Sequence, residues 1–130
     1  MDVSTADVLQ RYAAAFAEDH ERASVDFYAD DVVLRIPGRH RYAGEFRGRG
    51  PVLAALNALT SATEGTFGAR EVIDAAFTPS TAMVHVLMGA ARQGRTAEWE
   101  RVIVYRLSGQ RIQQIAFFDF DPRPLEQLLD

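Results

Sequence analysis

The chain has 130 residues, a size typical of one domain, and 48% of its residues are hydrophobic, which is ample for one core. It contains neither cysteine nor lysine, so thiolate nucleophiles, disulfides, thiolate metal sites and Schiff bases are excluded. The net charge of -4 arises from interspersed acidic residues and arginines. Because no basic run is long enough to follow a phosphate backbone, we expect no nucleic-acid partner.

The N-terminal residues 1–4 lack the basic start and apolar run of a signal peptide. No stretch approaches the roughly 20 apolar residues of a membrane span, so we expect a cytoplasmic protein without membrane contact. Ser4 and Asp7 resemble a capping box, and apolar residues then recur at helical spacing up to Asp19, which predicts a first helix. Asp19 can in turn cap a shorter second helix that should stop near residues 30–31.

A strand is predicted over residues 32–36, where Pro37-Gly38 ends it. The segment 39–49 has no clear period and is expected to be a loop. Pro51 suits the first turn of a third helix with an apolar stripe. After Gly65 the pattern changes to long strands joined by short turns, at about 66–77, 81–92, 96–107 and 111–120.

Three helices followed by hairpin-linked strands predict an α+β fold of one domain, residues 1–130, with the helices packed on one face of a curved antiparallel sheet. The last strand ends in residues 117–121, where two carboxylates lie among three aromatic rings. Alternation places Phe117 and Asp119 on one face and Phe118 on the other, so both faces are apolar.

A carboxyl group in such surroundings should have its pKa raised, which would suit Asp119 to move protons near neutral pH. Asp119→Asn should then leave stability unchanged or increased at neutral pH. The alternative is that Asp119 and Asp121 cap the turn at 122–124 and the short helix after it. The pattern favours capping for Asp121 and leaves both roles open for Asp119.

Several segments carry a family resemblance. Gln10-Arg11-Tyr12, residues 28–32 and Pro37-Gly38 resemble stretches of bacterial ketosteroid isomerase, whereas residues 43–49 and Phe118-Asp119 resemble SnoaL-like polyketide cyclases. The chain is therefore identified as similar, over nearly its whole length, to the nuclear transport factor 2-like superfamily. The resemblance implies a conical, strongly curved sheet and helices that enclose an apolar pocket for a small apolar ligand, with no cofactor.

The resemblance also limits the activity. In ketosteroid isomerase an Asp base works with an oxyanion hole of one Tyr and one protonated Asp. The Tyr matches Tyr12, but the Asp positions are Ile36 and Ile103 here, so this activity is not expected. Limonene epoxide hydrolase is disfavoured because its Arg-x-Asp pair has no clear counterpart in 82–92. The acid or base aspartate of SnoaL-like cyclases matches Asp119.

Other candidates have structural alternatives. Tyr12 lies on the apolar stripe of its helix, where it is either core or a hydrogen-bond donor, and Asp119 is a candidate partner for its hydroxyl. Trp99 and Arg101 share a strand face with Ile103 and Tyr105, and by the resemblance this is the cavity face. Trp99 is then either a flat wall for a ligand ring or a core tryptophan with a satisfied N–H.

Arg101 needs a carboxylate, a backbone acceptor or a ligand anion if it is enclosed, and we expect it instead to be solvated near the pocket mouth. His40 lies in the loop that should border the pocket entrance, where it is either catalytic or simply exposed. The three histidines are not spaced as metal ligands, so no metal is expected.

The opposite sheet face is predicted to be too apolar for water, and a homodimer would cover it. Its residues should be Met83, His85, Leu87, Val102, Val104, Phe118 and Phe120.

The sequence therefore predicts a cofactor-independent acid/base enzyme that isomerises or cyclises a small carbonyl, enol or epoxide compound. Asp119 would be the acid or base, and Tyr12 would donate to the substrate oxygen. The apolar walls would be Phe16, Ile36, Trp99 and Phe117. The alternatives are a binding protein for a lipophilic molecule, which needs the same walls without the carboxylate, and a dimeric adaptor whose cavity is filled by its own side chains.

Overall fold

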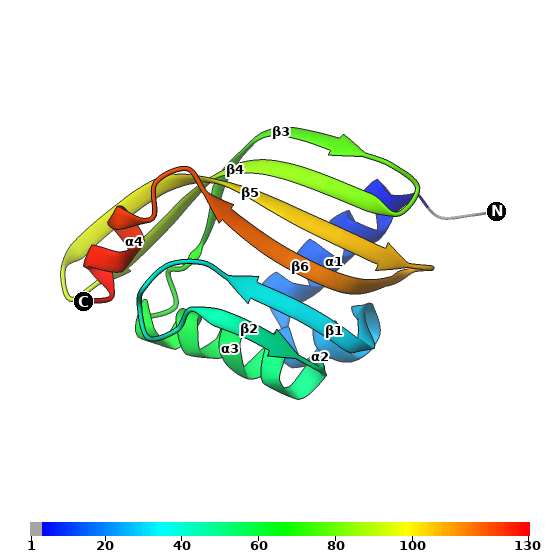
Figure 1. The fold of residues 1–130 in the computed structure, drawn as a ribbon, viewed down its shortest axis with the longest axis horizontal. Coiled ribbons are helices and arrows are strands. Elements are labelled where there is room, and N and C mark those ends of the chain that lie inside the picture. The colour runs from blue at the N-terminus through cyan, green and yellow to red at the C-terminus, as the bar shows by residue number, and fades with distance from the viewer. Residues whose placement is uncertain (1–3) are drawn as a thin grey trace.

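The structure, a computed structural model, describes residues 4–130 as four helices and one six-stranded sheet (Figure 1). Residues 1–3 lie outside the described residues. They belong to the N-terminal segment in which the sequence shows no signal-peptide pattern. Across the described part of the chain, no helix has both the length and the apolar character needed to cross a membrane. The helices are α1 (Thr5–Glu18), α2 (His20–Phe27), α3 (Arg49–Ala62) and α4 (Arg123–Leu128).

The strands form one curved, mixed sheet in the order β2-β1-β6-β5-β4-β3. Strands β3 to β6 are the predicted antiparallel meander, and the α+β prediction is confirmed. Strand β1 runs parallel to β6 and so joins the N-terminal half of the chain to the meander. The strands are β1 (Tyr28–Ile36), β2 (Gly44–Arg47), β3 (Gly68–Phe77), β4 (Thr81–Arg92), β5 (Arg95–Ser108) and β6 (Arg111–Asp119).

Both predicted helix caps are present. The Ser4 hydroxyl accepts a hydrogen bond from the Asp7 N–H at 3.1 Å, and the Asp19 carboxylate accepts one from the Arg22 N–H at 3.1 Å. The predicted end of the second helix near residues 30–31 is wrong, because α2 stops at Phe27 and β1 begins at Tyr28. Tyr28 is fully buried in extended conformation and pairs with β6, which outweighs the weak helical signal of the residues that follow.

The loop predicted at 39–49 contains a strand, β2, which pairs antiparallel with β1 from Ile36↔Gly44 to Val33↔Arg47. It lies at the sheet edge and none of its residues is buried. An edge strand of four residues with no buried face carries no alternation of polar and apolar residues, and this is why the sequence does not show it.

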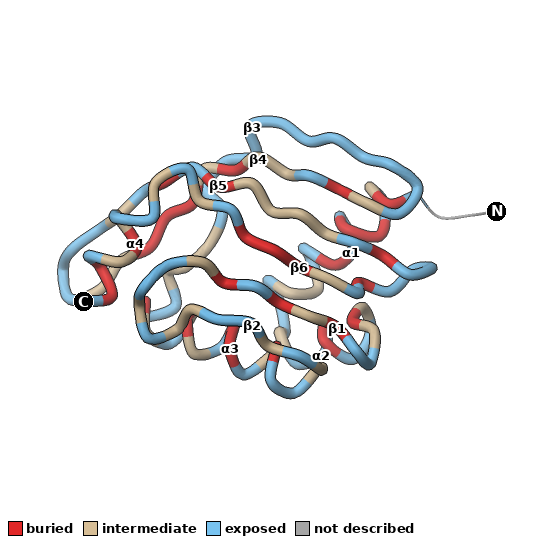
Figure 2. The backbone as a smooth tube through the Cα atoms, viewed as in Figure 1, coloured by how far each residue is buried: buried red, intermediate tan, exposed pale blue. Residues whose placement is uncertain are grey.

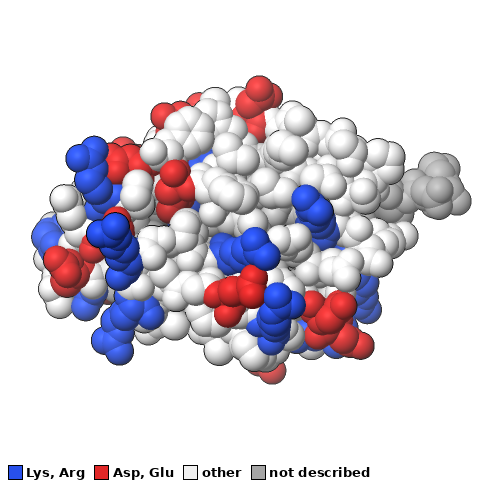
Figure 3. All heavy atoms as spheres, viewed as in Figure 1, with Lys and Arg blue, Asp and Glu red and all other residues white. Residues whose placement is uncertain are grey.

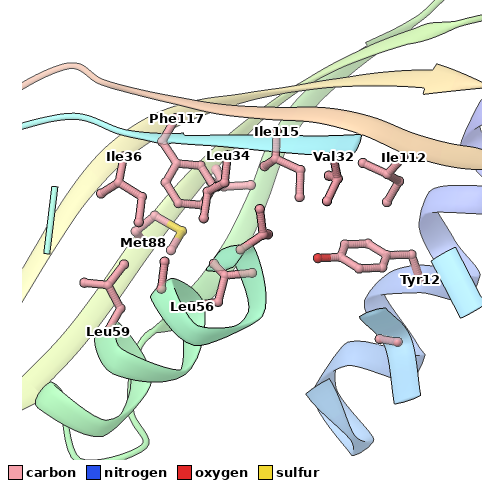
Figure 4. Packing of buried hydrophobic residues seen from close by; sticks show 14 of the residues in the cluster. Tyr12, Val32, Leu34, Ile36, Leu56, Leu59, Met88, Ile112, Ile115 and Phe117 are labelled. Carbon is pink, nitrogen blue, oxygen red and sulfur yellow. The ribbon is translucent and has the colours of Figure 1, made fainter. Parts of the chain in front are cut away.

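The core lies between β1, β6 and the inward faces of α1 and α3 (Figure 2). Figure 4 shows Leu34 and Ile115 from the two parallel strands above Leu56 of α3, with Tyr12 reaching in from α1. By contrast, β3 is exposed along nearly its whole length. The C-terminal helix α4 buries Leu125 and Leu128 against the far end of β4 and β5.

Candidate ligand cavity

A cavity of about 490 Å³ lies between the concave sheet face and helices α1 and α3, and we call it the Arg101 cavity. Its lining includes Arg101, Ile103 and Tyr105 of β5. These three residues alternate along the strand and lie on one face, as the sequence predicted. Its other aromatic lining residues are Tyr12, Phe16, Phe67 and Phe117. Cavities with mostly apolar walls and a few fixed polar groups are the usual form of small-molecule sites.

Arg101 is a fully buried cation, with no exposed surface. Its Nε donates to Asp119 Oδ1 at 2.6 Å and its Nη2 donates to Asp119 Oδ2 at 3.2 Å, which gives a two-point ion pair. The third nitrogen, Nη1, is buried and has no hydrogen-bond partner within residues 4–130. The expectation of a solvated Arg101 at the pocket mouth is therefore wrong: opposite Arg101, the register of β5 and β6 places a carboxylate that makes its burial tolerable.

Aromatic rings hold the guanidinium of Arg101 in place. Its central carbon lies 4.2 Å from the ring centroid of Phe117, 5.4 Å from that of Phe67 and 5.5 Å from that of Trp99. Such contacts stabilise a desolvated cation and restrict its movement. Nη1 is thus a fixed donor without a partner, on a residue that belongs to the cavity lining.

Asp119 has a different setting from the one expected. Its carboxylate oxygens accept both bonds from Arg101, and Oδ1 also accepts from Trp99 Nε1 at 3.1 Å. Asp119 and Trp99 are not part of the cavity lining but lie behind Arg101. The expectation of a raised pKa for Asp119 rested on an apolar setting without a cationic partner. That premise is wrong, because the buried guanidinium of Arg101 is a cationic partner. Trp99 is the core tryptophan with a satisfied N–H.

Tyr12 lines the cavity, but its hydroxyl does not contact Asp119. It lies 2.6 Å from the hydroxyl of Tyr28, so the suggested pairing with Asp119 is wrong. Burial raises the pKa of Tyr12 well above its ordinary value and raises that of Tyr28 to about 12. Burial also raises the pKa of Tyr105, which lines the cavity beside Tyr12. All three phenols therefore stay protonated at physiological pH.

The remaining predicted residues divide into two groups. Phe16 and Phe117 line the cavity, whereas Ile36 is buried in the core outside the lining. His40 is partly buried away from the cavity, where its Nδ1 accepts from the Tyr42 N–H at 3.1 Å. Desolvation lowers the pKa of His40, and the nearby Glu126 carboxylate of α4 partly opposes this shift.

Asp121 contacts the turn as expected, since its carboxylate accepts from the backbone N–H of Arg123 at 3.0 Å and pairs with the Arg123 side chain.

Sequence reasoning missed His20, the first residue of α2, which lines the cavity. Its ring stacks on Phe16 with centroids 3.9 Å apart, and its Nδ1 lies 2.9 Å from Asn57 Oδ1 of α3. No periodic signal marked His20, because Asp19 lies in extended conformation between α1 and α2 and interrupts the helical path. Phe67 was missed because it lies in the turn before β3, where no periodicity marks it.

A second hollow of about 650 Å³ lies at the start of α1, next to the turns before β4 and β6. Its lining, Ser4 to Ala6, Phe77 to Pro79, Gly109 and Gln110, contains no titratable side chain. The Arg101 cavity instead offers a buried, fixed and unpartnered donor, and we place the candidate site there. In residues 4–130 no group of three or more acidic or histidine side chains is arranged to hold a metal ion.

Comparisons with known proteins agree on the fold. No family model matches the chain. It is 29% identical over 125 residues to the uncharacterized protein Rv0034 of Mycobacterium tuberculosis, covering 96% of this chain and 95% of that protein. Among solved structures, an NTF2-like protein from Burkholderia xenovorans superposes with a TM-score of 0.80 at 17% identity, covering 95% and 93% of the two chains.

A protein from Mesorhizobium loti that bears the name SnoaL-like polyketide cyclase superposes with a TM-score of 0.66 at 12% identity, covering 89% of this chain and 99% of the other. The chain therefore has the nuclear transport factor 2-like fold that its sequence resemblance implied, with the strongly curved sheet of that fold. The curated relative is itself uncharacterized, so the activity must be argued from the cavity.

Proposed function

We propose that this protein binds a small, mostly apolar carbonyl compound in the Arg101 cavity, with the carbonyl oxygen accepting a hydrogen bond from Arg101 Nη1. The observation that carries the proposal is that Arg101, whose buried Nη1 has no partner, belongs to a lining that is otherwise mostly apolar and aromatic. An unsatisfied buried donor costs about 1–3 kcal/mol, and more when it is charged. A ligand oxygen at this position would remove that cost, and the aromatic rings would contact the rest of the ligand.

The charge of the site favours a neutral ligand. Arg101 and Asp119 are both buried and together carry no net charge. A carboxylate in the cavity would lose its hydration and would add a second negative charge close to Asp119. A ketone or aldehyde carbonyl accepts the same hydrogen bond without either cost, so neutral carbonyl compounds should bind more tightly than carboxylates of the same shape.

The geometry supports ligand binding over the two other functions that the sequence suggests. An enzyme using Asp119 as acid or base needs a carboxylate oxygen free to meet the substrate, and here both oxygens accept from Arg101. An adaptor needs a filled cavity, whereas about 490 Å³ lies between the side chains here. A binding site requires the apolar walls and one fixed polar group, and residues of the cavity provide both.

The test compares 2-acetonaphthone with 2-ethylnaphthalene, which has nearly the same shape but no oxygen, by equilibrium dialysis against the parent protein and Arg101→Lys. Lysine keeps the charge opposite Asp119 but lacks the guanidinium arm that carries Nη1. A hydrogen bond to a charged group contributes about 1.5–3 kcal/mol, so the parent should bind the ketone at least about tenfold more tightly than the hydrocarbon. The lysine variant should bind both equally.

Equal binding of the two compounds by the parent would refute the role of Arg101, and failure of both to bind would refute the ligand site. 2-Naphthoate, the carboxylate of the same ring system, should bind more weakly than the ketone to the parent.

We further propose that the protein is a homodimer through the outer face of the sheet. Met83, Phe118 and Phe120 are 52%, 55% and 61% exposed on this face. Single exposed apolar residues are common on protein surfaces, whereas a contiguous group of large ones is uncommon. Figure 3 shows positive and negative side chains interspersed on the visible face, so that neither sign covers it. Such a mixture of charges does not oppose self-association. The cytoplasmic location stays a prediction from the sequence.

A further inference from the structure

The outer face of the sheet carries acidic and basic residues on two separate sides of its apolar group. Strand pairing identifies the members of this face, because residues directly opposite each other in a sheet point to the same side. Val102 lies opposite Phe118 of β6 and opposite His85 of β4, and Ala116 of β6 lies opposite Arg35 of β1. The neighbours of Val102 along β5 line the Arg101 cavity, so these residues point away from the helices.

Two carboxylates form the acidic side of the face, next to His85. Asp74 of β3 lies opposite His85, and Glu100 Oε1 of β5 lies 3.0 Å from His85 Nε2. The ring of His85 stacks on Phe120 with centroids 5.0 Å apart, which holds it against the apolar group. Asp74 accepts a hydrogen bond from the N–H of Ala75 at 2.8 Å and forms no ion pair within residues 4–130, so its charge is available to a second molecule.

Two arginines form the basic side of the face. Arg106 lies six residues further along β5 than Glu100 and on the same face, at a distance of about 20 Å along the strand. Arg35 of β1 lies two strands from β5, on the side opposite to β3. Arg35 contacts Glu45 at 2.9 Å, whereas Arg106 is exposed and forms no ion pair in the described part of the chain.

An apolar line, drawn from Met83 of β4 to Phe118 of β6, separates the two sides of the face. The two residues lie on either side of β5, and both are exposed. With strands about 4.8 Å apart and residues about 3.3 Å apart along each strand, Arg106 and Asp74 occupy mirror positions across this line, each about 8 Å from it. The second arginine and the second carboxylate are related across the line in the same way. The charges on the face are therefore self-complementary.

We propose that these charges determine how a second copy of the chain sits on this face, with the two-fold axis of the dimer along the apolar line. Rotation by 180° about this line lays the acidic side of each protomer on the basic side of the other. Arg106 of one protomer then faces Asp74 of the other, and Arg35 faces Glu100. Each pair occurs twice, because both protomers use the same surface. This inference rests on the dimer proposed above and states which residues meet in it.

The same charges disfavour the other symmetric placement of the two sheets. An axis perpendicular to the apolar line would lay the acidic side of one protomer on the acidic side of the other, and the basic side on the basic side. Asp74 would then face Glu100 of the other protomer, and Arg35 would face Arg106. Like charges brought together in an interface are costly, so the arrangement of the four residues selects one placement.

Charge reversal, measured by sedimentation equilibrium, tests this placement. Arg106→Asp puts a carboxylate against Asp74 of the other protomer at two symmetry-related positions, so the Kd of the dimer should rise at least about tenfold. The double variant Arg106→Asp with Asp74→Arg exchanges the two charges and should restore the Kd to within a few-fold of the parent. High salt should narrow the difference between Arg106→Asp and the parent, because it screens attraction and repulsion alike.

Arg11→Asp is the matched control, because it changes the net charge by the same amount at an exposed position of α1, on the helical side of the molecule. This control should dimerise like the parent. If Arg106→Asp weakens the dimer no more than Arg11→Asp does, or if the double variant dimerises no better than Arg106→Asp, the placement is wrong while the dimer stands. A parent that is monomeric at micromolar concentration removes both proposals, so one measurement separates the two failures.

Discussion

Arg101 and Asp119 form a buried ion pair, and such a pair is costly to break because either partner alone is an uncompensated charge in a poor solvent. The Asp119→Asn variant should therefore lose about 3 kcal/mol or more of unfolding free energy at pH 7. This is the opposite of the outcome expected for an isolated carboxyl group in an apolar pocket. Urea unfolding of the two proteins at pH 7 measures the difference.

Asp121→Asn is the control for that experiment, since Asp121 lies two residues further on and its partnership with Arg123 is exposed to solvent. Its removal should change stability little, because an exposed ion pair is screened by water. If Asp119→Asn proves as stable as Asp121→Asn, the ion pair does not hold Arg101 in place.

His40 predicts a dependence of stability on pH. Desolvation lowers its pKa in the folded chain below the ordinary value of 6.5, so below that value the unfolded chain binds more protons than the folded chain. Its contribution to stability is thus complete above about pH 6.5 and is lost as the pH falls from there toward the folded pKa. The parent should lose more stability between pH 8 and pH 5.5 than His40→Asn, whose side-chain oxygen can still accept from the Tyr42 N–H.

If the unfolding free energies of the parent and of His40→Asn change equally with pH, desolvation of His40 does not cause the pH dependence.

The sequence predicted which face of β5 and β6 each side chain would occupy. It did not predict which residues of the two strands would lie opposite each other. The hairpin pairs Ser108 with Arg111, and a bulge between Arg106 and Leu107 then shifts the register by one residue. Without the bulge Phe118, rather than Asp119, would lie opposite Arg101. A one-residue insertion of this kind has no sequence pattern of its own, so the ion pair was not predictable.

The α3–β3 turn carries Phe67 onto the cavity wall, and Thr66 ties this turn to β4. The Thr66 hydroxyl accepts from the Ala91 N–H at 2.6 Å and donates to the Thr63 carbonyl. Thr66→Val keeps the shape but leaves these groups without partners, which should cost about 1–3 kcal/mol of unfolding free energy. Thermal or urea unfolding measures this cost, and Ser61→Ala, at an exposed position of α3, should be close to neutral.

The same substitution should weaken binding of 2-acetonaphthone, because Phe67 would be held less firmly beside Arg101. Unchanged stability would show that the turn is held by other contacts.

Elements with a clear period were predictable and elements without one were not. The meander strands fall within two residues of their expected bounds because long alternating runs are separated by short turns with Gly or Pro. In contrast β2 has no buried face, and the end of α2 depends on Tyr28 meeting Tyr12 across the core. Contacts between distant segments decide such boundaries, and local sequence does not contain them.

For the whole molecule, the proposed dimer places Phe118 in the centre of an interface. Phe118→Asp should give a monomer in sedimentation equilibrium at micromolar concentration, while the parent is a dimer. The control is Val25→Asp, since Val25 is 57% exposed on α2 and belongs to the helical side of the molecule. It should remain dimeric, and a monomeric parent would remove the dimer from the account.

A hydrogen bond from Arg101 Nη1 to a ligand carbonyl is measured by the ¹³C NMR shift of the labelled carbonyl carbon of bound 2-acetonaphthone. A charge-assisted hydrogen bond polarises the carbonyl, so the signal should move downfield of its position in an apolar solvent when the parent binds the ketone. The downfield shift should be absent with Arg101→Lys. A carbonyl signal at the same position in both complexes would show that Arg101 makes no such hydrogen bond.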